Sequence, residues 1–184
     1  MIDCRVGISF AAHGISARRP GERGPDFSAT IAERQEEQMD STARHERAQQ
    51  VVTELCDWAD TRPDVLALAL VGSYARPPGA ETAESDVDII VVTSDPGRYT
   101  DGTGNLPPVL ELPLLRAKQW GVVAERRSRH ATTGLVVELN ITTPVWAATE
   151  PEVDGGTRRV VRDGIRVLRD RDGLLAKLID ACAA

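Results

Sequence analysis

Two neighbouring segments of the sequence decide the fold: Leu70-Val-Gly-Ser-Tyr-Ala-Arg76 and Ser85-Asp-Val-Asp-Ile-Ile-Val-Val92. The first ends an apolar run, residues 65–71, that has the length of a buried strand. The second contains a run, residues 87–92, that is β-branched throughout after Asp88 and also predicts a strand. Because Gly72 carries no side chain, the backbone can approach a ligand closely at the turn after the first strand, and the amides that follow suit phosphate oxygens.

Asp86 and Asp88 stand two positions apart at the start of the second strand. Successive side chains of a strand point to opposite faces, so both carboxylates share one face while Val87 and Ile89 point to the core. Magnesium prefers carboxylate oxygens together with substrate phosphates, and two ions ~4 Å apart can hold the attacking and leaving oxygens of a phosphoryl transfer. The pair therefore predicts a site for Mg²⁺, with two ions expected.

A third acid is expected on a neighbouring strand, and Glu138 meets this requirement. Residues 135–142 alternate apolar and polar positions, which places Glu138 on the face opposite Leu139. There it would bind the second ion and accept the proton of an acceptor hydroxyl. The alternative interpretation is an exposed glutamate on a one-sided sheet. Arg76 is predicted either to stabilise the charge of a triphosphate or to form a surface ion pair.

Gly72-Ser73, Arg76 and the segment Ser85–Asp88 resemble the signature of the nucleotidyltransferase superfamily, in which a Gly-Ser pair precedes an Asp-x-Asp pair and a third acid follows. The chain is similar to the small bacterial branch that includes aminoglycoside nucleotidyltransferases and minimal nucleotidyltransferase antitoxins. The resemblance covers mainly residues 65–93. The loop after Arg76 begins with Pro77, where the family often has Gly, and is about two residues longer than the commonest spacing.

The resemblance implies an α+β fold in which a mixed β-sheet is flanked by helices, as in the polymerase beta-like nucleotidyltransferases. It implies magnesium-dependent transfer of a nucleoside monophosphate from ATP or another nucleoside triphosphate to a hydroxyl acceptor, with release of pyrophosphate. The residues it implies are Gly72, Ser73, Arg76 and Ser85 for nucleotide binding and Asp86, Asp88 and Glu138 for metal binding and catalysis.

The acceptor is expected to be a small molecule or a protein. In the antitoxin-like alternative, the acceptor of AMP is a residue of a partner toxin. We expect the chain to lack the C-terminal helical domain with which larger small-molecule transferases hold the acceptor, so that a partner or a second copy in a homodimer supplies that wall. A third alternative is a nucleotide-binding module without turnover.

The composition restricts the classes of partner. A net charge of -6 and a pI near 5.1 argue against nucleic acid, because that affinity comes mostly from Lys and Arg. The longest apolar stretches fall short of the ~20 residues that cross a bilayer, so no membrane span is expected. The cysteines Cys4, Cys56 and Cys182 form no C-x-x-C pair, which predicts a cytoplasmic protein with neither a disulfide framework nor a zinc site. Scattered histidines are predicted to face solvent; they are His13, His45 and His130. The tryptophans are predicted to pack in the core rather than to serve as base-stacking platforms, because they are scattered and aromatic residues make up only 4% of the chain; they are Trp58, Trp120 and Trp146.

The length of 184 residues suits one domain. Residues 1–38 are predicted to be a flexible N-terminal tail and residues 39–184 the nucleotidyltransferase domain, with the functional protein expected to begin near Met39. Apolar residues at helical spacing predict a helix over residues 41–60 and another from Leu174. Two β-rich runs around Asp163-Gly164 predict a hairpin over residues 159–168.

Overall fold

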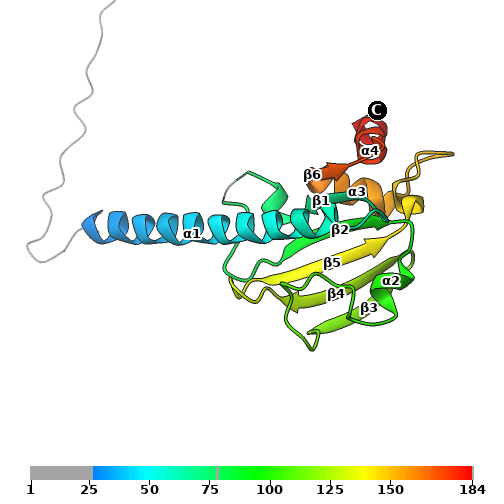
Figure 1. Ribbon diagram of the computed structural model, residues 1–184. Helices are drawn as coiled ribbons and strands as arrows, with labels where there is room; N and C mark the ends of the chain where they lie inside the picture. Colours follow the sequence, from blue (N-terminus) through cyan, green and yellow to red (C-terminus); the bar gives the residue numbers. More distant parts are fainter. Residues whose placement is uncertain (1–26, 78, 184) are drawn as a thin grey trace, which may run out of the picture.

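The computed structural model describes residues 27–77 and 79–183, which form a six-stranded mixed sheet with helices on both faces (Figure 1). The strand order is β3-β4-β5-β2-β1-β6, and all neighbours are antiparallel except β2 and β5, which are parallel. The predicted α+β class and mixed sheet are therefore confirmed. The strands are β1 (Val65–Val71), β2 (Val87–Thr93), β3 (Arg116–Trp120), β4 (Val123–Arg129), β5 (Val136–Thr142) and β6 (Ile165–Asp170). The helices are α1 (Phe27–Asp60), α2 (Gly97–Thr100), α3 (Gly155–Asp163) and α4 (Leu174–Ala183), with the 3₁₀ helices η1 (Ser73–Ala75) and η2 (Pro144–Ala147).

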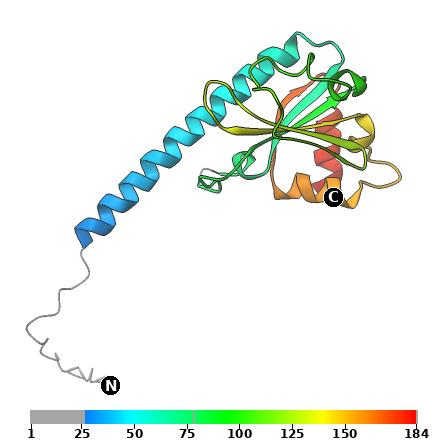
Figure 2. The same cartoon turned by 90° about the horizontal axis from the view of Figure 1, so that it is seen from below.

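Each face of the sheet has its own hydrophobic core. On one face α1 packs its apolar stripe against the central strands, as Leu55 and Ile89 illustrate. On the other face η2, α3 and α4 form a second core with β1 and β2, which includes Ile90 and Leu178. Figure 2 shows α1 on one side of the sheet and α3 and α4 on the other. Successive residues of β1 and β2 belong to the two cores in turn, because their side chains point to opposite faces of the sheet. Polar residues of β3, β4 and β5 share the face of Ile90, where they can line a cavity.

Helix α1 is longer than the sequence pattern predicts. It begins at Phe27, so residues 27–38 of the predicted flexible tail belong to this helix. The stretch contains neither Gly nor Pro and is rich in Ala, Glu, Gln and Arg, which are good helix formers. This end of the helix projects beyond the sheet in Figures 1 and 2. The remainder of the predicted tail, residues 1–26, lies outside the described residues.

The hairpin predicted over residues 159–168 is wrong in its first half. Residues 159–163 belong to α3, and only the second half forms a strand, β6. The carboxylate of Asp154 caps α3 by accepting a hydrogen bond from the amide of Thr157 at 3.0 Å. Gly164, with a φ of 137°, ends the helix. The predicted strands over residues 65–71, 87–92 and 135–142 and the last helix are confirmed.

The predictions for the tryptophans and histidines are confirmed only in part. Trp58 and Trp146 are buried as predicted, whereas Trp120 is 50% exposed. His130 is fully buried, contrary to its predicted exposure, and its Nε2 lies 3.2 Å from the carboxylate of Glu54 on α1. His13 lies outside the described residues. Within the described part of the chain, none of the helices combines the length and the apolar character needed to cross a bilayer.

Candidate active site

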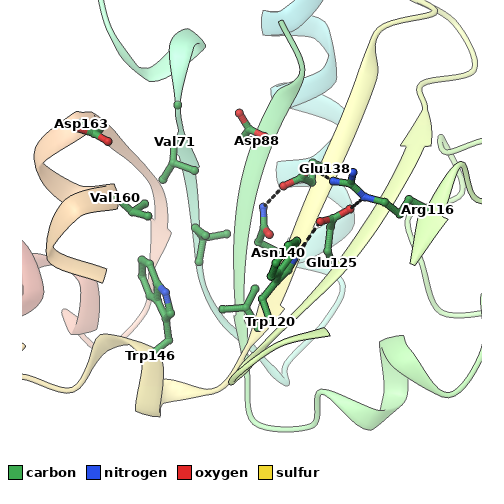
Figure 3. Close-up of a pocket in the computed structure, with 13 residues that line it drawn as sticks. Val71, Asp88, Arg116, Trp120, Glu125, Glu138, Asn140, Trp146, Val160 and Asp163 are labelled. Carbon is green, nitrogen blue, oxygen red and sulfur yellow. Dashed lines mark hydrogen bonds and ion pairs between the residues drawn. The ribbon is translucent and has the colours of Figure 1, made fainter. Parts of the chain in front are cut away.

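Asp88 and Glu138 are direct neighbours across the parallel pair β2 and β5. Residues paired in register have side chains on the same face, so both carboxylates project from the sheet together. Both line a cavity of about 460 Å³, between the sheet and α3 (Figure 3). Asp163 of α3 and Trp146 of η2 lie on the opposite side of this cavity.

Among the carboxyl groups of the site, Asp88 has the largest pKa shift. Burial, then the negative charges of Glu138 and Asp86, raise its pKa from 3.8 to about 7. The guanidinium of Arg127 opposes this shift without cancelling it. A carboxyl surrounded by like charge in this way is a common property of sites that bind a cation or move a proton.

Glu138 is held by two neighbours on its own face of the sheet. The amide of Asn140 donates to one carboxylate oxygen at 3.3 Å, and a terminal nitrogen of Arg116 donates to the other at 3.4 Å. Burial raises the pKa of Glu138 above its ordinary value. Its side chain is therefore oriented before any ligand arrives.

Asp86 lies just before β2 and behaves differently from its predicted partners. Its carboxylate forms an ion pair with Arg127 at 2.6 Å, and it does not line the cavity. Among residues 27–77 and 79–183, no three His, Cys, Asp or Glu side chains are arranged to hold a metal ion. The structure thus brings two of the three predicted acids together, and Arg127 holds the third.

Gly72 forms the corner between β1 and η1, directly against Asp88. Its φ of 72° and ψ of -149° lie in a region that is almost restricted to glycine. A Cβ atom added at this position would lie 2.5 Å from a carboxylate oxygen of Asp88. The absence of a side chain at Gly72 therefore makes room for the Asp88 carboxylate, and the close approach of a ligand to this backbone stays a prediction.

The other predicted nucleotide-binding residues lie outside the cavity lining. Ser73 is half-buried and begins η1. Ser85 is engaged locally, because its hydroxyl accepts a hydrogen bond from the amide of Thr82 at 2.9 Å. Arg76 is exposed and packs beside Gly164, where an added Cβ would lie 2.8 Å from the Arg76 Cγ. Arg76 therefore packs beside Gly164 and does not line the cavity that holds Asp88 and Glu138.

Three charged residues of β3 and β4 belong to the site and are missing from the sequence-based prediction. Arg127 lies opposite Glu138 in the β4–β5 register, and Arg116 lies opposite Arg127 on β3. Glu125 is 1% exposed and pairs with Arg116, which holds the pKa of Glu125 below its ordinary value. The alternation of β4 places Glu125 and Arg127 on one face, but only the strand order shows that this face is the one that carries Asp88.

The loop that leads into Asp86 is fixed by a buried carboxylate, Glu81. One of its oxygens accepts a hydrogen bond from the amide of Gly79 at 3.0 Å, and the other accepts one from Ser41 of α1 at 3.3 Å. Burial opposes ionisation of this carboxylate, but these hydrogen bonds and His45 keep its pKa below the ordinary value. Glu81 therefore ties the long loop after η1 to helix α1.

Replacing Glu81 with alanine is expected to lower the free energy of unfolding by about 1–3 kcal/mol, because the Gly79 amide and the Ser41 hydroxyl lose their charged acceptor. Urea unfolding at pH 7 measures the change. The matched control is Glu84→Ala, which removes an exposed carboxylate from the same loop and should change stability by less than about 0.5 kcal/mol. Equal effects of the two substitutions would contradict the anchoring role of Glu81.

In comparisons with known proteins, no protein-family model matches the chain, and no curated protein matches its sequence.

Proposed function

We propose that the protein is a magnesium-dependent nucleotidyltransferase with a polymerase beta-like fold. It would transfer a nucleoside monophosphate from a nucleoside triphosphate to a hydroxyl acceptor and release pyrophosphate. The observation that carries this proposal is the pairing of Asp88 with Glu138 on adjacent parallel strands, beside Gly72 and a cavity of about 460 Å³. A cavity of this size suits a small-molecule substrate.

Two of the residues present, Asp88 and Glu138, offer hard oxygen ligands for a divalent cation on one face of the sheet. Burial and then the negative charges of Glu138 and Asp86 raise the pKa of Asp88, and a cation would offset those charges. Asp86 is close enough to raise the pKa of Asp88 and would complete the set on leaving Arg127. When bound, Mg²⁺ would neutralise charge on the phosphates and stabilise the attacking and leaving oxygens.

The side chains of the site then have separate tasks. The acceptor oxygen attacks the α-phosphorus, the bond to the bridging oxygen of the leaving pyrophosphate breaks, and the acceptor proton passes to a carboxylate. Glu138 suits the role of proton acceptor, because burial raises its pKa and Asn140 fixes its orientation. Arg116 and Arg127 provide positive charge beside the carboxylates, where a triphosphate would lie.

A second candidate function is a nucleotide-binding module without turnover. The ion pair between Asp86 and Arg127 favours it, because a carboxylate held by an arginine at 2.6 Å is not free to bind a metal. The two functions differ in one measurable product, pyrophosphate.

The test uses triphosphates labelled on the α-phosphate, Mg²⁺ and a cell extract as the source of acceptor. A transferase releases pyrophosphate and moves the label to a small molecule or to a protein, and it does neither when Asp88 is replaced with asparagine. Transfer to a protein would support the antitoxin-like acceptor. Binding of the triphosphate without pyrophosphate release would favour the module without turnover.

A further inference from the structure

Trp120 stands at the end of β3, on the wall of the cavity that holds the carboxylates (Figure 3). We propose that the nucleobase of the bound triphosphate stacks on the indole ring of Trp120. This inference rests on the proposed function and extends it to the part of the substrate that the carboxylates do not contact.

The ring of Trp120 is fixed in place before a ligand binds. Its Nε1 donates a hydrogen bond to the carboxylate of Glu125 at 2.9 Å, and Glu125 is itself buried and held by Arg116. The ammonium of Lys118 lies 3.5 Å from the centroid of the ring and covers it from one side. These contacts restrain both the direction and the tilt of the ring, so a base that stacks on it does not have to order it first.

The exposure of Trp120 distinguishes it from the other two tryptophans. Trp58 and Trp146 are 7% and 6% exposed, and the ring of Trp58 meets Tyr99 edge to face, with 5.5 Å between the centroids. Trp120 is 50% exposed, although its ring is large and mostly apolar. A role in core packing does not account for an indole that is oriented by a buried carboxylate and left half in water.

The position of Trp120 favours the base of the same substrate whose phosphates meet the carboxylates. The cavity has Asp88 at one end, and Trp120 and Trp146 lie on opposite sides of its other end (Figure 3). Gly72 lies beside Asp88, and Val123 adds an aliphatic side chain to the cavity lining. A nucleoside triphosphate has the matching order of charged and planar groups, and aromatic stacking accepts every base because each has a π face.

The test compares ATP with inorganic tripolyphosphate, which has the phosphates but no base. Binding to the full chain is measured by calorimetry with Mg²⁺ and without acceptor, for the wild type and for Trp120→Ala. The substitution is expected to weaken ATP binding by about 10- to 100-fold and to leave tripolyphosphate binding unchanged. Trp120→Phe, which keeps a ring, should recover most of the ATP affinity.

Val145→Ala is the matched control, because Val145 is 66% exposed and lies outside the lining of this cavity. It should leave both affinities unchanged, and thermal melts of all variants check that they are folded. If Trp120→Ala weakens both ligands equally, or neither, the stacking proposal is overturned while the proposed function stands. If neither ATP nor tripolyphosphate binds to the wild type, the proposed function fails, and the stacking proposal fails with it.

Discussion

Replacing Asp88 with asparagine is expected to abolish transfer and, at the same time, to stabilise the protein in metal-free buffer. Loss of a carboxylate that would bind the proposed Mg²⁺ should lower the rate at least about 100-fold. The stabilisation follows from the position of Asp88, where burial and then the charges of Glu138 and Asp86 raise its pKa to about 7. Asparagine has nearly the same shape and cannot ionise, so it avoids the free-energy cost of a negative charge at this position.

The pKa of Asp88 determines how the stability of the wild type changes with pH. In the unfolded chain the Asp88 carboxyl loses its proton near the ordinary aspartate pKa of 3.8, but in the folded protein it keeps the proton to about pH 7. Between these values the folded state binds more protons, so its stability falls as the pH rises. The stability advantage of Asp88→Asn over the wild type should therefore grow by about 2 kcal/mol between pH 5 and pH 8.

Denaturant unfolding of both proteins at the two pH values, with a chelator present, measures this difference. Asp180→Asn is the control, since Asp180 is an exposed residue of α4 whose replacement should change the free energy of unfolding by less than about 0.5 kcal/mol. An advantage of Asp88→Asn that stays constant with pH would contradict the electrostatic account. Undiminished pyrophosphate release by Asp88→Asn would contradict the proposed site.

Replacing Gly72 with alanine should damage both stability and activity. The backbone there has a φ of 72°, and the new methyl group would lie 2.5 Å from the Asp88 carboxylate, well inside contact distance. Backbone strain of this kind costs about 1–3 kcal/mol, and the contact adds to it. Since relief of the contact must move Asp88, and misplacement by about 1 Å can cost 10²-fold in rate, transfer should fall by a similar factor.

Gly134→Ala separates the strain from the contact. Gly134 has a φ of 71°, but an added Cβ would meet no atom within 4 Å. This control should lose stability through backbone strain alone and retain full activity. Parallel urea unfolding and pyrophosphate assays of the two variants make the comparison, and similar losses of activity in both would show that the contact with Asp88 is unimportant.

The central strands could be predicted from the sequence because burial on both faces leaves apolar runs, which only Asp88 interrupts. The runs at residues 65–71 and 87–92 show this directly. The position of Glu138 was also predictable, since its alternation with Leu139 is set by the strand alone. Its pairing with Asp88 was not, because it depends on β5 lying next to β2 in the sheet.

The features that the sequence does not predict depend on tertiary structure or on weak local signals. Helix α3 begins with Gly155-Gly156, which are poor helix formers, and it contains the β-branched Val160 and Val161, which favour a strand. These residues outweigh the helix signal of the cap at Asp154. Arg116 and Arg127 are ordinary surface arginines by sequence. They become part of the site because β3 and β4 extend the sheet on the side of β5.

Glu125 supports two parts of the site, because its one buried carboxylate binds both Arg116 and Trp120. Arg116 also contacts Glu138, so the charged region and the aromatic region share a single support. The energetic effects of substitutions at Arg116 and Trp120 should therefore be non-additive, as expected for groups joined by one network. A substitution of Glu125 itself would loosen the phosphate side and the base side of the site together, whereas a substitution of Trp120 leaves the contacts of Arg116 with Glu125 and Glu138 in place.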